Sequence, residues 1–140
     1  RYVEIKTRKT KKDWALFVES IEEQYKNVEK ITLVMDNLNT HKPGSLYEIF
    51  APEKAKRLLD RFEFVYTPKH GSWLNIAENE LSSMTGQCLK DRKMTDIDML
   101  RKETSAWATN SNEKQRGVNW QFKVENARQK LRSLYPKNII

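Results

Sequence analysis

The chain has 140 residues, 38% of them hydrophobic, and carries 26 Lys and Arg against 19 Asp and Glu, for a net charge of +7. A single domain is expected at this length, and the positive charge favours a nucleic-acid partner slightly over an ordinary soluble surface. One cysteine and two histidines exclude an intrachain disulfide and a cysteine-rich zinc site, and the lack of a long apolar stretch or signal peptide predicts a cytoplasmic protein without a membrane partner.

The first half of the sequence alternates predicted strands with predicted helices. Residues 2–7 alternate and are rich in β-formers, which predicts a strand, and an amphipathic helix is expected over residues 10–27. Residues 31–36 form a short apolar run that is typical of a parallel strand buried on both faces. The remaining elements of this half are a short helix capped by Ser45, a helix from Pro52 to about residue 61, and a strand over residues 62–66.

The second half of the sequence is predicted to be helical. Ser72 is expected to cap a helix that runs to about residue 90, and further helices are expected over residues 96–110 and 124–135. Because strands and helices alternate in the first half, we expect parallel strands joined by right-handed crossovers in a layered α/β domain. The helix after Ser72 has one apolar stripe, formed by Trp73, Ala77, Leu81, Met84 and Cys88.

Asp36 is the first candidate for chemistry, because it ends the apolar run at residues 31–36. Ligands and metals gather at the carboxyl ends of strands in open α/β sheets. An Asp here could also simply begin a turn, but the four apolar residues before it favour a function. A strand ending in Asp is also found in P-loop ATPases, although the sequence lacks their G-x-x-x-x-G-K-[ST] loop, which weakens that alternative.

Two glutamates, Glu78 and Glu80, lie early in the helix predicted after residues 62–66. Glu78 also fits a capping box with Asn75, which would be a purely structural role. At about 100° per residue, both glutamates lie on the flank of the apolar stripe, so helical geometry does not choose between them. A strand-end Asp and a helix-start Glu could together suit Mg²⁺, which takes one or two carboxylates with phosphate oxygens.

Polar and basic residues follow Asp36 and precede the glutamates. They are candidates for phosphate or DNA contact, and a solvated turn explains them equally well. Trp73 is expected to be a core anchor rather than a base-stacking residue, and Trp107 and Trp120 more strongly so. The candidate DNA-contacting residues are Asn37, His41, Lys42, Lys69, His70 and Ser72.

Two longer motifs carry a family resemblance. VMDNLNTH (residues 34–41) and TPKHGSWLNIAE (residues 67–78) resemble the second and third catalytic blocks of DDE-superfamily transposases, most closely the mariner-like group encoded by bacterial insertion sequences. The similarity continues through the C-terminal helices to residues 131–136 and so covers nearly the whole chain. Asp36 matches the second catalytic Asp, and Glu78, three residues after the Leu-Asn pair, matches the final Glu.

The resemblance implies a ribonuclease H-like, three-layer α/β/α fold with a short parallel sheet and C-terminal helices. It implies that Asp36 and Glu78 bind Mg²⁺ or Mn²⁺ and that the enzyme hydrolyses a phosphodiester at a transposon end. The new 3′ hydroxyl would then attack target DNA. The implied partners are the transposon ends and the target DNA, in a nucleoid-associated bacterial protein, and assembly as a homo-oligomer is left open.

The family's first catalytic Asp lies on an early strand that has no match in this sequence. We therefore expect residues 1–140 to be a partial catalytic domain, truncated at its N-terminus and inactive or nearly so in strand cleavage. In the family's sheet, the missing strand lies between two other strands, one matching residues 2–7 and the other matching residues 31–36. Because unpaired buried backbone groups cost about 1–3 kcal/mol each, we expect these two segments to pair directly in a three-stranded sheet, or a second molecule to supply strands.

Two other functions stay open at this stage. A non-catalytic nucleic-acid-binding or oligomerisation module would share the basic charge but would not depend on a metal ion. A ribonuclease H-type nuclease acting on RNA–DNA hybrids is a third option, although nothing in these residues reads a 2′-hydroxyl.

Overall fold

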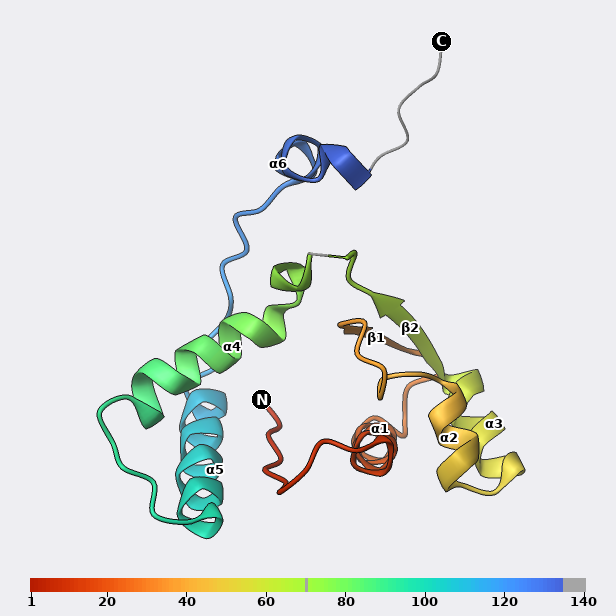
Figure 1. Cartoon of the computed structure of the whole chain (residues 1–140), viewed down its shortest axis with the longest axis horizontal. Coiled ribbons are helices and arrows are strands. Elements are labelled where there is room, and N and C mark those ends of the chain that lie inside the picture. The colour runs from red at the N-terminus through yellow and green to blue at the C-terminus, as the bar shows by residue number, and fades with distance from the viewer. Residues whose placement is uncertain (70, 135–140) are drawn as a thin grey trace.

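The computed structural model describes residues 1–69 and 71–134, and its elements are labelled in Figure 1. The helices are α1 (Lys11–Gln24), α2 (Gly44–Ile49), α3 (Pro52–Arg61), α4 (Ile76–Met84), α5 (Ile97–Glu113) and α6 (Val124–Lys130), and the strands are β1 (Ile31–Met35) and β2 (Phe62–Tyr66). Short helical turns lie at Ser72–Leu74, Thr85–Leu89 and Arg132–Leu134. None of the helices in these described ranges is long and apolar enough to cross a membrane.

The two strands form a parallel sheet, as the alternating pattern predicts. Ile31 lies opposite Phe62 and Met35 opposite Tyr66, and the crossover between the strands contains α2 and α3. Pro52 begins α3, the position where its fixed φ and missing N–H suit the first turn. The short parallel sheet with its helices is compatible with a truncated α/β fold of the ribonuclease H type.

The main core lies on one face of the sheet. The residues of β1 that point inward, ending at the buried Met35, and the buried Phe62 of β2 pack against α1, α2 and α3. Thr10 caps helix α1, and its side chain accepts a hydrogen bond from the N–H of Asp13 in a capping box. The fully buried side chains of this core are Ala15 and Val18 of α1, Leu46 of α2, and Ala55 and Leu58 of α3.

The other face of the sheet is exposed. Val34 is 48% exposed and Val65 is 42% exposed, and Thr32 and Glu63 on the same face form a hydrogen bond between their side chains. The prediction that residues 31–36 are buried on both faces is therefore wrong. The apolar run reflects strand-forming side chains in general, because β-branched residues favour strands whether or not both faces are covered.

Residues 2–7 do not form a strand in the structure, so the predicted three-stranded sheet is wrong for this chain. Tyr2 stacks on Phe17 of α1 with 5.4 Å between ring centroids, and Val3 packs on a second core in α4 and α5. Figure 1 shows the N-terminal segment between α1 and these two helices. The side chains of this segment thus pack on helices on both sides, and its backbone does not pair with β1. That a second molecule adds strands to the sheet stays a prediction.

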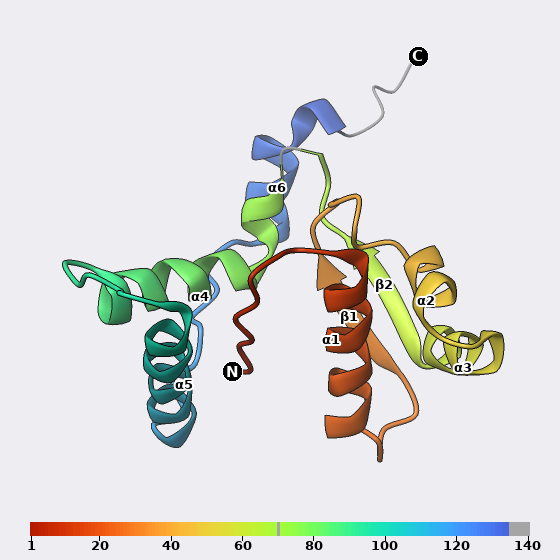
Figure 2. The same cartoon turned by 60° about the horizontal axis from the view of Figure 1, so that its bottom comes forward.

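The second core joins α4 to α5 through Met84, Cys88, Trp107 and Ala108, and Figure 2 shows these two helices beside each other and apart from the sheet. The predicted apolar stripe of α4 is buried only in this C-terminal half, because Leu81 is 56% exposed.

Two predicted helix caps are wrong. Asn75, not Ser72, caps α4, and Ser45 is a buried residue inside α2 without a capping hydrogen bond. The helix expected over residues 124–135 ends at Lys130.

Candidate active site

Asp36 is the first residue after β1, at the carboxyl end of the sheet where the sequence places it. The N–H of Thr67 donates to the carbonyl of Met35 at 2.9 Å, which continues the strand pairing beyond the end of β2. The side-chain amide of Asn37 donates to the carbonyl of Thr67 at 2.6 Å. These two bonds fix the loops that follow β1 and β2 against each other.

His41 holds the Asp36 carboxylate. Its Nδ1 lies 2.7 Å from Oδ1 of Asp36, and its ring stacks on the buried Trp14 with 6.0 Å between centroids. The hydroxyl of Tyr66, the last residue of β2, donates to the carbonyl of His41 at 2.7 Å. The imidazole is therefore held against the core and the backbone of His41 against the sheet, and within residues 1–69 and 71–134 no hydrogen bond engages Oδ2 of Asp36.

Tyr66 was missed by sequence reasoning, although it lies opposite Met35, the residue that precedes Asp36. Burial raises the pKa of its phenol, so the neutral, hydrogen-bonding form is favoured. The available signal was an aromatic hydroxyl at the end of β2, the strand that neighbours the one preceding Asp36.

A cavity of about 210 Å³ opens beside Asp36. Four of the predicted site residues meet there, namely Asp36, Asn37, Lys69 and Ser72, and the other described residues of its lining are Leu38, Thr67 and Pro68. Of the other predicted DNA-contacting residues, Lys42 is exposed and does not line this cavity, and His70 lies outside the described residues.

Gly71 allows the turn before Ser72 to fold tightly. Its N–H donates to the carbonyl of Pro68 at 2.8 Å, and a Cβ at this position would lie 2.7 Å from Cγ of Pro68. Such a contact is shorter than real Cβ atoms tolerate, and a proline ring cannot swing away. The glycine therefore permits the turn that brings Ser72 to the cavity.

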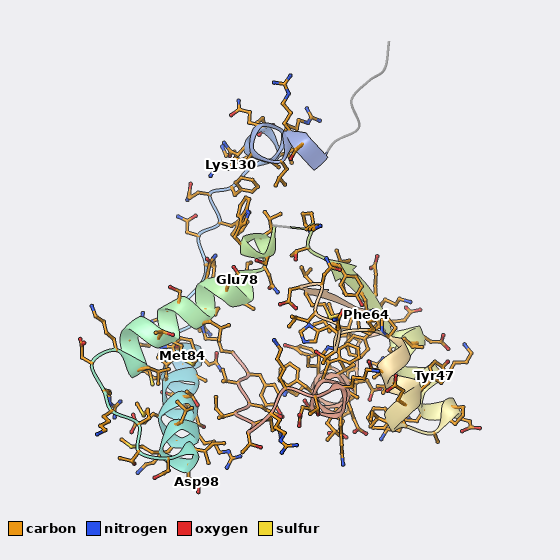
Figure 3. The ribbon with its side chains drawn as sticks, in the orientation of Figure 1. Tyr47, Phe64, Glu78, Met84, Asp98 and Lys130 are labelled. Atoms are coloured by element: carbon orange, nitrogen blue, oxygen red, sulfur yellow. The ribbon has the colours of Figure 1, made fainter. Side chains whose placement is uncertain are left out.

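Glu78 and Glu80 differ in what they bind. The guanidinium of Arg1 forms an ion pair with Glu80 and donates from Nη2 to Oε1 at 2.9 Å, and this hydrogen bond raises the pKa of Arg1. Glu78 is exposed near the start of α4, at the end of the helix that is nearer the sheet (Figure 3). Asn75 caps α4 by accepting from the N–H of Ala77, and the described contacts include no return bond from the Glu78 carboxylate. The predicted capping box is therefore wrong, and the Glu78 carboxylate has no capping role.

The oxygen donors of Asp36 and Glu78 suit a hard divalent cation. Mg²⁺ is usually held by one or two carboxylates, with waters and substrate phosphates completing its shell, and Mn²⁺ takes similar ligands. Within residues 1–69 and 71–134, no three His, Cys, Asp or Glu side chains are grouped so that they could hold a metal ion. Of the two acids, only Asp36 is among the described residues that line the cavity. A cation there would draw further ligands from water and from a phosphate.

Comparison with protein families gives a match to the DDE superfamily endonuclease family over residues 1–101. The chain belongs to this family, which consists of nuclease and transposase enzymes that act on DNA. The matched region contains Asp36 and Glu78 and ends inside α5, so α6 lies outside it. Comparisons with curated proteins and with solved structures found no match.

Proposed function

We propose that the chain is part of the catalytic domain of a mariner-like DNA transposase encoded by a bacterial insertion sequence. The observation that carries the proposal is the family match, which includes both Asp36 and Glu78. Asp36 follows a parallel strand, and Glu78 lies in the helix after the neighbouring strand. In this function the protein would act on DNA in the cytoplasm, at the nucleoid, and joining two transposon ends would favour a homo-oligomer.

Asp36 and Glu78 would hold Mg²⁺ or Mn²⁺, which when bound activates an attacking hydroxyl and neutralises charge at the phosphate. In the first reaction, water attacks the phosphorus at the transposon end, the bond to the 3′ oxygen breaks, and that oxygen leaves as a 3′ hydroxyl. In the second, this hydroxyl attacks a target phosphate and displaces another 3′ oxygen. His41 would orient Asp36, while Asn37, Lys69 and Ser72 would contact the phosphate in the cavity that they line.

The choice of Glu78 over Glu80 is supported by the ion pair of Glu80 with Arg1. A carboxylate that already has a guanidinium partner would have to give up that partner to bind a cation. Glu78 is exposed and has no such ion pair among the described residues. The proposal therefore assigns the metal-binding role in α4 to Glu78.

The DNA-binding assay that tests this function compares Mn²⁺ with EDTA. A labelled duplex carrying the end of the encoding element should bind more tightly in Mn²⁺, because the cation bridges the acids and a phosphate. Asp36→Asn and Glu78→Gln should each remove this gain, while Glu80→Gln, the matched control, should keep it. Equal binding in Mn²⁺ and EDTA would favour a non-catalytic nucleic-acid-binding or oligomerisation module, and a preference for an RNA–DNA hybrid would favour a ribonuclease H-type nuclease.

We further propose that these 140 residues supply two of the three catalytic acids that the family's motif requires, and therefore cut DNA weakly or not at all by themselves. A cleavage assay on the same labelled duplex, in Mg²⁺ and in Mn²⁺, tests this statement. Robust cleavage that disappears in Asp36→Ala would show instead that all the necessary acids lie within the 140 residues.

A further inference from the structure

The C-terminal segment returns to the beginning of α4. After α5, the chain runs back past α4 to α6, which lies beyond the turn Ser72–Leu74 in both views (Figures 1 and 2). Phe122 packs edge-on against Trp73, with 4.9 Å between ring centroids. Because Ser72 lines the cavity that contains Asp36, this contact places the C-terminal segment directly beside the candidate active site.

Aromatic rings gather at this contact and are not buried by it. Trp120 packs edge-on against Phe122 with 6.2 Å between centroids, and Trp73 and Trp120 are 36% and 40% exposed. Trp107, by contrast, is only 8% exposed, in the second core. The expectation that all three tryptophans are core anchors is therefore confirmed for Trp107 and wrong for Trp73 and Trp120, whose ring surface is available to a ligand.

The same segment carries unpaired positive charge. Residues 114–134 contain six Lys or Arg and one Glu, and Nζ of Lys130 lies 5.7 Å from the centre of the Trp73 ring. In the described part of the chain, the salt bridges of basic residues lie elsewhere, for example Lys11 with Glu48, Lys56 with Asp60 and Arg92 with Glu103. A polyanion would thus meet cations here that no carboxylate of the described chain neutralises.

We propose that the surface formed by Trp73, Trp120, Phe122 and Lys130, here called the aromatic–basic surface, binds single-stranded DNA beside Asp36. Proteins that bind single strands combine cations along the backbone with aromatic rings on which bases stack. A duplex hides its base faces within the stack, so exposed rings favour an unpaired strand. This inference rests on the proposed function, because a DNA end held in the Asp36 cavity would bring its terminal, unpaired bases to the neighbouring rings.

The experiment measures fluorescence anisotropy in EDTA, so that no metal ion takes part. Its probes are labelled oligothymidine of about 12 nucleotides, within the site size of small single-strand binders, an abasic oligomer of equal length, and a duplex. Wild-type protein should bind oligothymidine about 5- to 150-fold more tightly than the abasic oligomer, the range expected for stacking of one base. Both affinities should fall as salt rises.

Variants separate stacking from charge. Trp120→Ala should remove the preference for oligothymidine over the abasic oligomer, and Trp120→Phe should keep much of it. Lys130→Ala should weaken binding of both probes by similar factors. The matched controls are Tyr47→Ala and Lys12→Ala, because Tyr47 is 48% exposed on α2, well apart from Lys130 (Figure 3), and Lys12 is exposed on α1.

Equal wild-type affinity for oligothymidine and the abasic oligomer would overturn the proposal, as would tighter binding of the duplex. If circular dichroism shows that Trp120→Ala is unfolded, the two wild-type affinities and the Trp120→Phe variant still decide the question. Failure of these measurements leaves the metal-dependent function untouched, because neither Asp36 nor Glu78 is needed for binding in EDTA. Conversely, loss of Mn²⁺ binding would leave the stacking result standing.

Discussion

Nδ1 of His41 lies 2.7 Å from Oδ1 of Asp36, and the His41 ring stacks on Trp14 in the main core. The orientation of the candidate catalytic carboxylate is therefore set by the packing of α1 against the sheet. His41, which the sequence places among the candidate DNA-contacting residues, is thereby a candidate positioning residue, since it contacts the Asp36 carboxylate and does not itself line the cavity.

His41→Ala should weaken Mn²⁺ binding about 10- to 100-fold, the usual cost of removing a group that orients a metal ligand. His41→Asn, which can still donate a hydrogen bond to Asp36, should restore part of the affinity. Calorimetric titration with Mn²⁺ measures both, with the free energy of unfolding as a check on folding. Unchanged affinity in His41→Ala would mean that Asp36 needs no orienting partner.

Tyr66 should make stability depend on pH in the alkaline range. Because burial raises its pKa in the folded state, its contribution is fully present below the unfolded pKa of about 10 and is lost as the pH rises through the folded value. Tyr66→Phe should remove this part of the pH dependence. It should also cost about 0.5–1.5 kcal/mol at neutral pH through the lost hydrogen bond to His41. Urea unfolding at several pH values tests both, and parallel curves for the two proteins above pH about 10 would contradict the assignment.

Gly71→Ala should destabilise the protein by about 1–3 kcal/mol, because the added Cβ meets the Pro68 ring and the turn must move. Gly44→Ala is the control, since its Cβ would meet nothing within 4 Å, and it should be neutral or stabilising by up to about 1 kcal/mol. Thermal unfolding of both variants measures the difference. Equal melting temperatures would show that the turn before Ser72 is not tightly constrained.

Duplex DNA should bind weakly and with little sequence preference, and its affinity should fall as salt rises because phosphate contacts release counterions. A titration at several salt concentrations in EDTA gives the slope of this dependence. An affinity indifferent to salt would indicate that the net charge of +7 is not directed at the phosphate backbone.

The features that could be predicted from the sequence depend on neighbouring residues. Residues 31–36 and 62–66 have strand-forming patterns bounded by turn residues, and Pro52 marks a helix start, so their parallel arrangement and the place of Asp36 follow. Residues 2–7 have an equally good strand pattern. In the structure they bind α1, α4 and α5 instead, because strand propensity acts only where a neighbouring strand is available.

The features that could not be predicted depend on residues far apart in the sequence. Glu78 and Glu80 look equivalent on a helix, and what separates them is an ion pair with Arg1, 79 residues from Glu80. Trp73 fits a core stripe as well as Met84 does. It stays exposed because the residues that reach it, Phe122 and Lys130, cover only part of its ring.

The most direct test of the account is a calorimetric Mn²⁺ titration of the wild type, Asp36→Asn, Glu78→Gln and Glu80→Gln. If Asp36 and Glu78 share one cation, the first two variants should each lose most of the Mn²⁺ affinity, while Glu80→Gln should bind as the wild type does. Wild-type affinity in Glu78→Gln, or loss of affinity only in Glu80→Gln, would contradict the proposed active site.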